Sequence, residues 1–263
     1  MTILKSICII IAVFLWTGLL APVQMLVLLA FKEHRHKIPQ IYHAGLCRLL
    51  QVDVVVSGEM SQERPTLFVL NHISWLDIPI IGKIIPGSFV AKTDVENYPL
   101  VGAVSKLQET IFIERTRPSI MGHKGEMQGH LDKGDNLILF PEGTSSNGII
   151  LQPFKSSYLA LAEREINGQH LPVQPVTIAY SRLRNMSLTR GNMSIVAWVG
   201  DEELLAHIWA FLKTGKVTAE LRFHKTVTID DYDSRKTLAS DCQLTIAMGL
   251  SRVLTGRTEA EET

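Results

Sequence analysis

The N-terminal part of the chain is a long hydrophobic run. No charged residue occurs between Ser6 and Phe31, and most positions in between are Ile, Leu, Val, Phe or Ala. A helix of this length would reach about 39 Å, which exceeds the hydrocarbon core of a bilayer, about 30 Å thick. Pro22 interrupts the run, so the sequence leaves open a kinked membrane-spanning helix and two shorter half-helices that enter one leaflet.

A retained anchor is favoured over a cleaved signal peptide. Lys5 resembles the basic start of a signal peptide, and Ala21 is the small residue best placed for cleavage. The hydrophobic run continues beyond Ala21, however, and Pro22 would directly follow the cut. We therefore expect the segment to stay in the protein and to bind the membrane.

A short basic segment, Lys32–Lys37, follows the hydrophobic run. It holds three fixed cations, against Lys5 and the amino terminus on the other side of the run. The positive-inside rule therefore favours a cytoplasmic location for the rest of the protein. His34 and His36 lie in the same segment, but no third metal ligand is in view, and interfacial basic residues are the favoured interpretation.

After residue 40, short runs rich in Val, Ile, Leu and Phe alternate with stretches of helical periodicity. The predicted strands are Val52–Ser57, Thr66–Leu70, Ser88–Ala91, Thr110–Glu114, Asn136–Phe140, Val173–Tyr180, Ser194–Val199 and Val217–His224. The predicted helices are Pro39–Leu50, Trp75–Ile84, Ser119–Asp132, Lys155–Arg164, Glu202–Lys213 and Ser234–Leu254. This alternation predicts an α/β fold: a single domain with a mixed, largely buried sheet flanked by helices, plus an N-terminal membrane helix or broken helical hairpin.

One predicted helix, Glu202–Lys213, is unusually apolar. Its hydrophobic stripe consists of Leu204, Leu205, Ile208, Trp209 and Leu212. A stripe of this kind faces either the core or a membrane, and the core-facing orientation is the commoner one.

Composition narrows the classes of function. Apolar residues make up 46 % of the 263 residues, which suits a folded domain with a substantial core. Lys plus Arg and Asp plus Glu number 26 each, so no charge excess points to nucleic acid. The three cysteines are widely spaced and form no C-x-x-C pair, which argues against a disulfide framework and a structural zinc site.

The first segment with candidate chemistry is Leu70–Asp77, which follows a predicted strand. His72 and Asp77 are five residues apart, too far round a continuous helix to meet, but close enough where a strand turns into a helix. An aspartate that holds one imidazole nitrogen leaves the other free to accept a proton. Alternatively, Ser74 and Asp77 form a capping box and His72 is an incidental loop residue; spacing alone does not decide between the two.

No activated nucleophile accompanies this pair. The chain has no G-x-S-x-G elbow, and Gly143–Gly148 has the wrong spacing for one. A His–Asp pair without a serine suggests that a hydroxyl of the substrate attacks directly, with His72 as its general base.

Two further segments suit an anion. Thr110–Arg115 is a predicted strand that ends in Glu114 and Arg115; the arginine suits a phosphate or carboxylate, or alternatively a surface ion pair with Glu114. Leu137–Ser146 is a predicted strand that runs into a glycine turn, whose exposed amides and hydroxyls also suit an anion. Around this turn Glu142, Gly143, Thr144 and, further on, Lys155 are candidates for substrate binding, although an ordinary turn and a solvated lysine remain alternatives.

Together these segments resemble the glycerolipid acyltransferase family, in particular bacterial 1-acylglycerol-3-phosphate acyltransferases. The family block N-H-x-x-x-x-D is matched by Asn71, His72 and Asp77; G-x-x-F-I-x-R by Phe112, Ile113 and Arg115; F-P-E-G-T by Phe140–Thr144; and V/I-P-V-x-P by Leu171, Pro172, Val173 and Pro175. The four blocks occur in family order over residues 70–176. One residue departs from the pattern, because Glu109 stands where the second block begins with Gly.

The resemblance implies a role for each block. His72 would deprotonate the acceptor hydroxyl, which attacks a thioester of acyl-CoA or acyl-carrier protein, and Asp77 would orient His72. Substrate-binding residues would be Phe112, Arg115, Glu142, Gly143, Thr144 and Lys155. No metal and no bound cofactor are implied. Residues 1–38 would form the anchor and its basic segment, 39–257 the catalytic domain and 258–263 an acidic tail.

The resemblance also implies a substrate class and a place in the cell. The leading expectation is acylation of 1-acylglycerol-3-phosphate to phosphatidic acid, at the bacterial inner membrane and with the catalytic domain facing the cytoplasm. The Ser-Trp-Leu-Asp-Ile-Pro run and the part after residue 176 also look like lyso-ornithine lipid acyltransferases, which gives a second acceptor. Outside acyl transfer, a thioester hydrolase would use the same His–Asp pair with water, and a lipid carrier would not use it at all.

Overall fold

The computed structural model describes residues 3–98, 100–113, 124–166, 168–200 and 202–256, and in these residues eight strands form one mixed sheet. The strands are β1 Val52–Ser57, β2 Leu67–Leu70, β3 Ser88–Lys92, β4 Ile111–Ile113, β5 Leu137–Leu139, β8 Val173–Leu183, β9 Met186–Ser187 and β10 Val217–Phe223. Their order is β1-β10-β8-β2-β5-β3-β4, and β9 pairs with β8. Two short strands, β6 Glu165–Ile166 and β7 Gln169–His170, pair with each other separately.

The strands that precede the candidate motifs are parallel neighbours. β2 pairs with β5 in parallel, with Val69 opposite Leu139, and β2 also pairs in parallel with β8. The carboxyl ends of β2 and β5 therefore meet at one edge of the sheet, and the two segments that follow them, from His72 and from Phe140, start side by side. β8 and β10 are antiparallel, which makes the sheet mixed.

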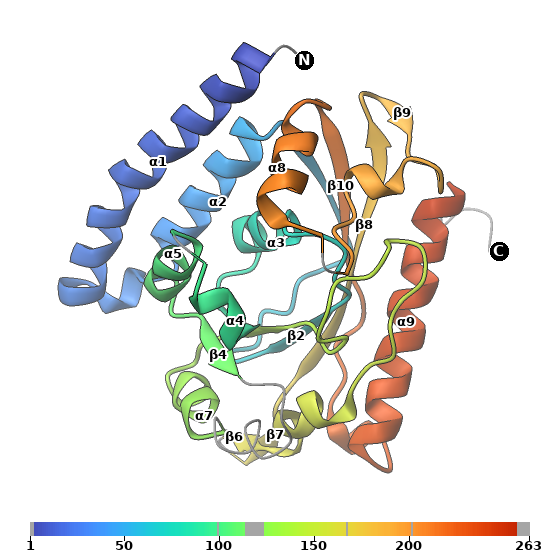
Figure 1. Cartoon of the computed structure of the whole chain (residues 1–263). Helices are drawn as coiled ribbons and strands as arrows, with labels where there is room; N and C mark the ends of the chain where they lie inside the picture. The colour runs from blue at the N-terminus through green and yellow to red at the C-terminus, as the bar shows by residue number, and fades with distance from the viewer. Residues whose placement is uncertain (1–2, 99, 114–123, 167, 201, 257–263) are drawn as a thin grey trace.

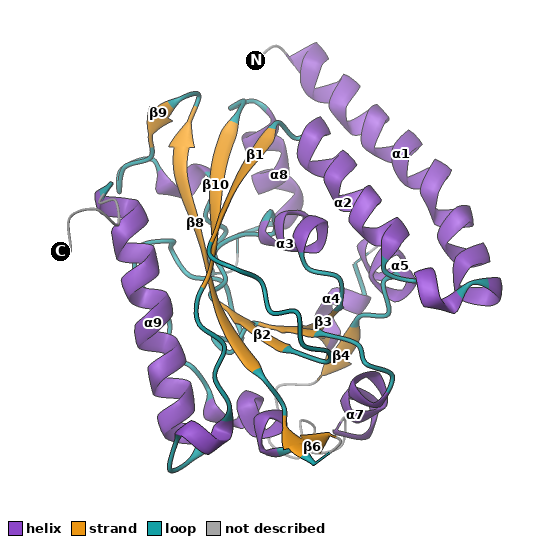
Figure 2. Ribbon diagram, turned by 180° about the vertical axis from the view of Figure 1, so that it is seen from behind, coloured by secondary structure: helices purple, strands orange, loops and turns teal. Residues whose placement is uncertain are grey.

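Helices cover both faces of this sheet (Figures 1 and 2). The α-helices are α1 Ile3–Ala30, α2 Lys37–Leu49, α3 Asp77–Ile84, α4 Thr93–Glu96, α5 Val101–Leu107, α7 Lys124–Asp132, α8 Leu204–Leu212 and α9 Arg235–Thr255. The 3₁₀ helices are η1 Lys32–His34, η2 Ser156–Glu163, η3 Met193–Ile195 and η4 Ile229–Asp231. Figures 1 and 2 place α1 outside α2 at one side of the molecule and α9 at the opposite side.

Two hydrophobic clusters, one on each face, hold the layers together. Alternate residues of β2 point to opposite faces, as the pleat requires: Phe68 and Leu70 join one cluster, and Leu67 and Val69 join the other. The first cluster includes residues from α2, α3 and α8, and the second includes residues from α7, η2 and α9. The predicted fold class, a mixed and largely buried sheet flanked by helices, is confirmed.

Two predicted elements have a different conformation. The strand expected over Ser194–Val199 is wrong: the segment is the 3₁₀ helix η3 followed by irregular chain. It is apolar because it is buried against the loop after β2, where the amide of Trp198 donates to the carbonyl of Ile73 at 3.0 Å. The helix expected over Lys155–Arg164 is a 3₁₀ helix, η2, rather than an α-helix.

The long N-terminal helix α1 runs through Pro22 as one helix, so the two separate half-helices are not observed. It is long and apolar enough to cross a membrane, by length and composition. Its side facing the protein is mixed and its outer side apolar. Ser6, Thr17 and Gln24 are buried together with Ile9, which belongs to the first hydrophobic cluster, whereas the outward Leu15 is 70 % exposed.

Hydrogen bonds attach the polar side of α1 to the rest of the protein. Gln24 Nε2 donates to the carbonyls of Arg35 at 2.9 Å and Leu107 at 2.8 Å. Trp16 Nε1 donates to the carbonyl of Tyr42 at 3.1 Å. A helix on a water-exposed surface turns its polar residues outward, whereas α1 buries three of them and exposes an apolar outer side, which suits a helix that faces lipid.

The contact between α1 and α2 gives a first testable prediction. A Cβ at Gly45 would lie 2.3 Å from Nε1 of Trp16, whereas a Cβ at Gly18 would have no heavy atom within 4 Å. Alanine favours a helix over glycine by about 1 kcal/mol at both positions, so comparing the two variants isolates the clash. We expect Gly45→Ala to be about 1–3 kcal/mol less stable than Gly18→Ala because Trp16 is displaced from the Tyr42 carbonyl. Chemical unfolding in detergent micelles measures the difference, and equal stabilities would contradict this packing.

Candidate active site

His72 and Asp77 meet at the turn between β2 and α3. His72 Nδ1 and Asp77 Oδ2 are 2.7 Å apart, and the Asp77 side chain is fully buried whereas that of His72 is 19 % exposed. An ionised carboxylate only accepts hydrogen bonds, so Nδ1 carries the proton and Nε2 is left as the basic nitrogen. Among the described residues, no hydrogen bond to Nε2 is recorded. The predicted pairing of the two residues is confirmed as a geometry, and its catalytic role stays a prediction.

Asp77, the first residue of α3, also holds the loop that precedes the helix. Its Oδ2 accepts the amide hydrogens of Ile73 at 2.6 Å and Ser74 at 2.9 Å. The capping box expected from Ser74 and Asp77 is not observed, because the N-cap of α3 is Leu76, without a side-chain cap bond, and the amides that Asp77 accepts belong to the loop. The amides fix the carboxylate, and the fixed carboxylate then holds the imidazole.

The buried phenol of Tyr180 in β8 contacts the same carboxylate. Its hydroxyl donates to Asp77 Oδ1 at 2.6 Å, and both side chains are fully buried. Burial and the neighbouring Asp77 raise the pKa of Tyr180 well above its ordinary value, so the phenol stays protonated and remains a donor. Nothing in the local sequence indicates this contact, because a tyrosine in an apolar strand is usually a core residue.

Asn71 holds the strand end in place. Its side chain makes two hydrogen bonds of 2.9 Å to the backbone of Ile178 in β8, one to the carbonyl and one from the amide. This pair of bonds joins the end of β2 to the strand that carries Tyr180. The Asn of the first block therefore has a structural role next to the His–Asp pair.

Phe140, the last residue before the glycine turn, forms one wall of the site. Its ring stacks on the His72 imidazole, with centroids 4.3 Å apart and planes inclined by 24°. The carbonyl of His72 accepts the amide hydrogen of Ser146 at 2.7 Å. The first and third blocks thus contact each other directly, as the register of β2 and β5 requires.

Glu142 lies beneath these loops and is only 2 % exposed. Its Oε1 accepts the amide hydrogen of His72 at 2.7 Å, and its Oε2 accepts that of Gln152 at 2.6 Å. Burial raises the pKa of Glu142 to about 7, although both amides favour the ionised form. The contacts described for this carboxylate are to the backbone that positions His72, while its predicted role in substrate binding stays a prediction.

The glycine turn brings two other candidates together. Gly143 has a φ of +69°, a conformation that favours glycine, and its amide donates to the carbonyl of Phe140 at 3.0 Å. A Cβ at Gly143 would lie 3.1 Å from Lys155 Nζ, so the ammonium group sits over the turn. Thr144 is exposed on the same turn. A cation beside an exposed hydroxyl is a suitable place for an anionic group.

The second block is described only in part. Phe112 lies half-buried in the edge strand β4, opposite Ala91 of β3. Arg115 and Glu114 lie outside the described residues, so their predicted role as anion contact or ion pair stays a prediction.

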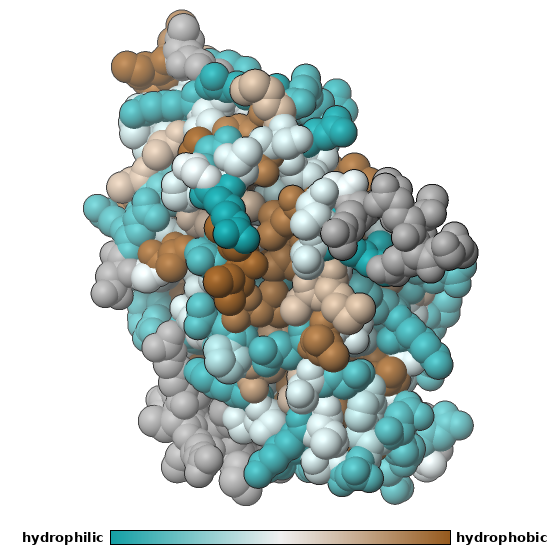
Figure 3. All heavy atoms as spheres, turned by 90° about the vertical axis from the view of Figure 1, so that its right-hand side faces the viewer, coloured by the Kyte–Doolittle hydropathy of each residue, from teal (hydrophilic) through white to brown (hydrophobic). Residues whose placement is uncertain are grey.

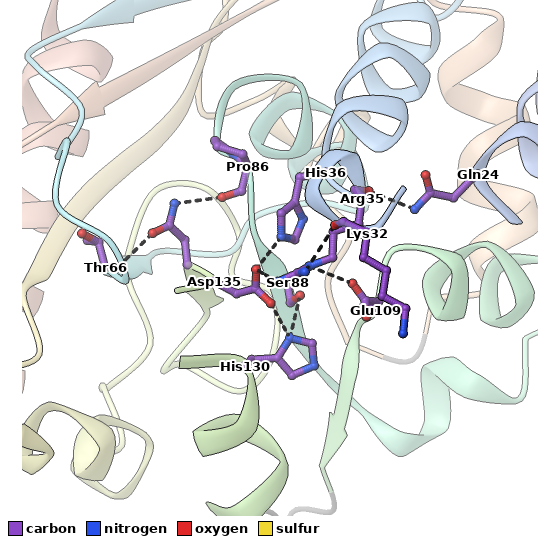
Figure 4. A network of polar contacts seen from close by, with 11 residues as sticks. Gln24, Lys32, Arg35, His36, Thr66, Pro86, Ser88, Glu109, His130 and Asp135 are labelled. Atoms are coloured by element: carbon purple, nitrogen blue, oxygen red, sulfur yellow. Dashed lines mark hydrogen bonds and ion pairs between the residues drawn. The ribbon is translucent and has the colours of Figure 1, made fainter. Parts of the chain in front are cut away.

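Glu109, which stands in place of the family glycine, also has a left-handed backbone, with a φ of +55°. The position therefore keeps the conformation for which glycine is suited, although the residue differs. Its carboxylate Oε2 lies 3.3 Å from Nε of Arg35, in the basic segment after α1 (Figure 4). Glu109 thus forms an ion pair with the basic segment Lys32–Lys37.

Arg35 belongs to a larger buried network centred on Asp135, just before β5 (Figure 4). The Asp135 carboxylate accepts hydrogen bonds from Arg35 Nη2 at 2.5 Å, His36 Nε2 at 2.8 Å and His130 Nδ1 at 3.2 Å. Burial alone would raise the pKa of Asp135, but the hydrogen bonds from His130, His36 and Arg35 hold it well below its ordinary value. His36 and His130 thus both form hydrogen bonds with the Asp135 carboxylate. Among the described residues, no cluster of side chains that could hold a metal ion is found.

The Tyr180 contact can be tested with a matched control. Tyr180→Phe keeps the ring and removes one of the hydrogen bonds that hold the Asp77 carboxylate in place against His72. With His72 as the predicted base, we expect kcat of acyl transfer to fall on the order of tenfold, with KM little changed, because a less firmly held carboxylate would orient the imidazole less well for the reaction.

Tyr232→Phe removes the same kind of bond elsewhere, between Tyr232 and Asp241 Oδ2, also 2.6 Å long. It should lower stability without changing kcat. Equal effects of Tyr180→Phe and Tyr232→Phe on turnover would show that Tyr180 acts through stability alone.

The raised pKa of Glu142 predicts that the stability of the folded protein depends on pH. The folded state releases the Glu142 proton at a pH of about 7, and an ordinary glutamate releases it at 4.5. Between these values the folded state binds more protons than the unfolded chain, so the stability contribution of Glu142 decreases as the pH rises. The decrease should be about 3 kcal/mol, since one pKa unit corresponds to about 1.4 kcal/mol.

Glu142→Gln removes this titration. The difference in unfolding free energy between the unmodified protein and the variant, measured in urea at pH 4.5 and at pH 7, should shift by that amount in favour of the variant. A difference that does not vary with pH would mean that Glu142 titrates normally.

Comparisons with known proteins agree with this geometry. The family model described as Acyltransferase matches residues 52–179. The chain is 34 % identical to the lyso-ornithine lipid O-acyltransferase of Brucella abortus (strain 2308), over 90 % of this chain and 91 % of that protein. It is 34 % identical to a 1-acyl-sn-glycerol-3-phosphate acyltransferase of Neisseria meningitidis, over 43 % of this chain and 45 % of that protein.

Among solved structures, the 1-acyl-sn-glycerophosphate (LPA) acyltransferase PlsC of Thermotoga maritima has the same fold, with a TM-score of 0.70 and 21 % identity over 97 % of both chains. The His–Asp pair at the end of β2, the F-P-E-G-T turn beside it and the similarity over nine-tenths of a known enzyme lead to one conclusion: this chain belongs to the acyltransferase family.

Proposed function

We propose that this acyltransferase moves a fatty acyl group from a thioester to the free hydroxyl of a lysolipid, and that the acceptor is lyso-ornithine lipid. The observation that carries the reaction type is the 2.7 Å contact between His72 Nδ1 and Asp77 Oδ2, which leaves Nε2 available as a base. The site lies where the carboxyl ends of two parallel strands meet, and its loops are fixed by backbone hydrogen bonds.

The chemistry follows from this arrangement. The acceptor hydroxyl approaches Nε2 of His72, gives up its proton to it, and forms a new C–O bond to the thioester carbonyl. The C–S bond then breaks, and the proton on His72 passes to the departing thiolate, so the imidazole returns to its neutral form. Asp77 stabilises the imidazolium between these two steps and holds its orientation. Acyl-CoA or acyl-carrier protein is the donor that this scheme requires.

The choice of lyso-ornithine lipid rests on the extent of the similarity. The match to the Brucella abortus enzyme extends over 91 % of that protein, while the match to the meningococcal enzyme covers only 45 %. Ornithine carries a carboxylate, which the ammonium of Lys155 over the Gly143 turn suits. The 1-acylglycerol-3-phosphate favoured by the motifs stays the second candidate, because a phosphate also suits this turn. Glu109 gives no argument for either acceptor, because its carboxylate pairs with Arg35.

Membrane attachment is the second part of the proposal. The outer side of α1 is apolar over the length of the helix, and the basic segment Lys32–Lys37 follows it. Arg35 is engaged by Asp135 and Glu109, so Lys32 and Lys37 are the fixed charges left to support a cytoplasmic orientation. We infer a location at the bacterial inner membrane with the catalytic domain on the cytoplasmic side, where acyl thioesters are made.

A transfer assay on the purified full-length chain tests the function. Lyso-ornithine lipid and 1-acylglycerol-3-phosphate are offered in parallel with one acyl donor, and each product is quantified. We expect ornithine lipid to form faster than phosphatidic acid. His72→Ala should reduce transfer about 10²- to 10⁴-fold, as removal of a general base does.

His170→Ala is a matched control, because His170 Nδ1 contacts Asp230 Oδ1 at 2.8 Å in a second His–Asp pair away from the site. It should leave transfer unchanged. Phosphatidic acid as the main product would overturn the choice of acceptor but not the reaction. Release of free fatty acid at the same rate with and without lysolipid would instead indicate a thioester hydrolase.

A further inference from the structure

Helix α8 is apolar on its outer side as well as on its inner side. His207, Phe211 and Leu212 are buried, and the outward Leu205 is 71 % exposed. Ala206 and Ala210 are exposed on the same helix. The single stripe expected from the sequence is thus divided along the helix: Leu212 is buried at its end, while Leu205, two turns earlier on the same stripe, is exposed at its start. A helix that borders water normally presents charged or polar residues on its outer side.

The end of α8 lies beside the start of α1. Ser6 Oγ on α1 donates to the carbonyl of Leu212 at the end of α8, at 3.2 Å, which joins the two helices. Near this contact, the outward Leu4 of α1 is 71 % exposed and Ile7 is 42 % exposed. The two helices therefore present apolar residues next to each other.

The end of α8 carries the residue types of a membrane interface. Lys213 Nζ lies 5.2 Å from the centroid of the Trp209 ring, and the ring is half-buried. Tryptophan is enriched where a membrane meets water, and a lysine at a helix end can extend its ammonium group toward the headgroups. This pair suits a helix that lies flat at the lipid surface.

The inner side of α8 contacts the block that holds the catalytic pair. Trp75 Nε1 donates to His207 Nδ1 at 3.0 Å, and the Trp75 ring meets that of Phe211 edge-on, with centroids 5.6 Å apart. Trp75 follows His72 by three residues in the same block. One short helix therefore lies between the outer surface and the segment that carries His72.

We propose that the outer side of α8 rests in the surface of the phospholipid bilayer beside α1, as a second membrane contact that holds the His72 block against the lipid. This inference rests on the membrane attachment proposed for α1 and adds a separate surface to it. A lipid surface is the occupant that fits, because α8 exposes no charged residue between Leu204 and Leu212, ends in a Trp–Lys pair, and contacts the apolar start of α1. It also places the base next to the phase in which a lysolipid lies.

Exposed apolar residues alone do not indicate a membrane contact. The side of the molecule that carries α9, shown in Figure 3, is largely hydrophilic with hydrophobic residues gathered near its middle. Leu244 on α9 is 60 % exposed, nearly as much as Leu205, but α9 packs on the other face of the sheet. Leu244 therefore provides a matched control for Leu205.

Site-directed spin labelling tests the proposal on the full-length chain. Cys8 is exposed and Cys47 and Cys242 are buried, so Cys8→Ser gives a background in which an introduced surface cysteine is labelled. Nitroxides are placed by Leu205→Cys, Leu244→Cys and Leu15→Cys in separate proteins bound to vesicles of phosphatidylethanolamine and phosphatidylglycerol. Collision rates with oxygen, which concentrates in lipid, and with a water-soluble nickel complex report the surroundings of each label.

We expect the labels at 205 and 15 to collide severalfold more with oxygen relative to nickel than the label at 244 does. A label at 205 that behaves like that at 244, while the label at 15 reports lipid, would overturn the role of α8 and leave the anchor intact. Labels at 205 and 15 that both collide mainly with the nickel complex, as in water, would overturn the membrane attachment itself. A label at 205 that is shielded from both reagents with and without vesicles would show that a second copy of the chain covers α8.

Discussion

The buried carboxylate of Asp77 is the group on which both the fold around the site and its chemistry depend. It accepts four hydrogen bonds, from the His72 imidazole, the amides of Ile73 and Ser74, and the Tyr180 hydroxyl. A buried charge is tolerated only when its hydrogen-bonding capacity is met. Two segments meet it here: the loop between β2 and α3, which contains His72, Ile73 and Ser74, and strand β8, which carries Tyr180. Any change that moves one of them therefore also moves the base.

The sequence predicts most of what is local and little of what is long-range. The spacing of His72 and Asp77 indicates a turn at a strand end, and seven predicted strands correspond to β1, β2, β3, β4, β5, β8 and β10. Ser194–Val199 was misassigned because burial against loops produces the same apolar composition as burial in a sheet. Tyr180 was missed because its partner lies 103 residues away, and no local pattern reports such a contact.

Charged residues around the site mainly form hydrogen bonds with the backbone or ion pairs with the basic segment after α1. Glu142 accepts amide hydrogens from two loops, and Glu109 and Asp135 hold Arg35 at the end of the anchor segment. Asp135 lies two residues before β5, the strand that leads to the F-P-E-G-T turn. The basic segment after α1 is thus tied to that strand, so the membrane attachment proposed for α1 and the construction of the site would share one set of contacts.

The polar side of α1 sets an order on the assembly of the protein. α1 is synthesised before the rest of the domain. The carbonyl of Leu107, which Gln24 contacts, lies 83 residues further along the chain, and that of Leu212, which Ser6 contacts, lies 206 residues further along. Until then Ser6 lacks this partner and Gln24 has only the carbonyl of Arg35, and burying polar side chains in hydrocarbon without partners is unfavourable. A nascent α1 bound to lipid would therefore be most stable at the water boundary, with its polar residues facing the water from which the rest of the domain arrives.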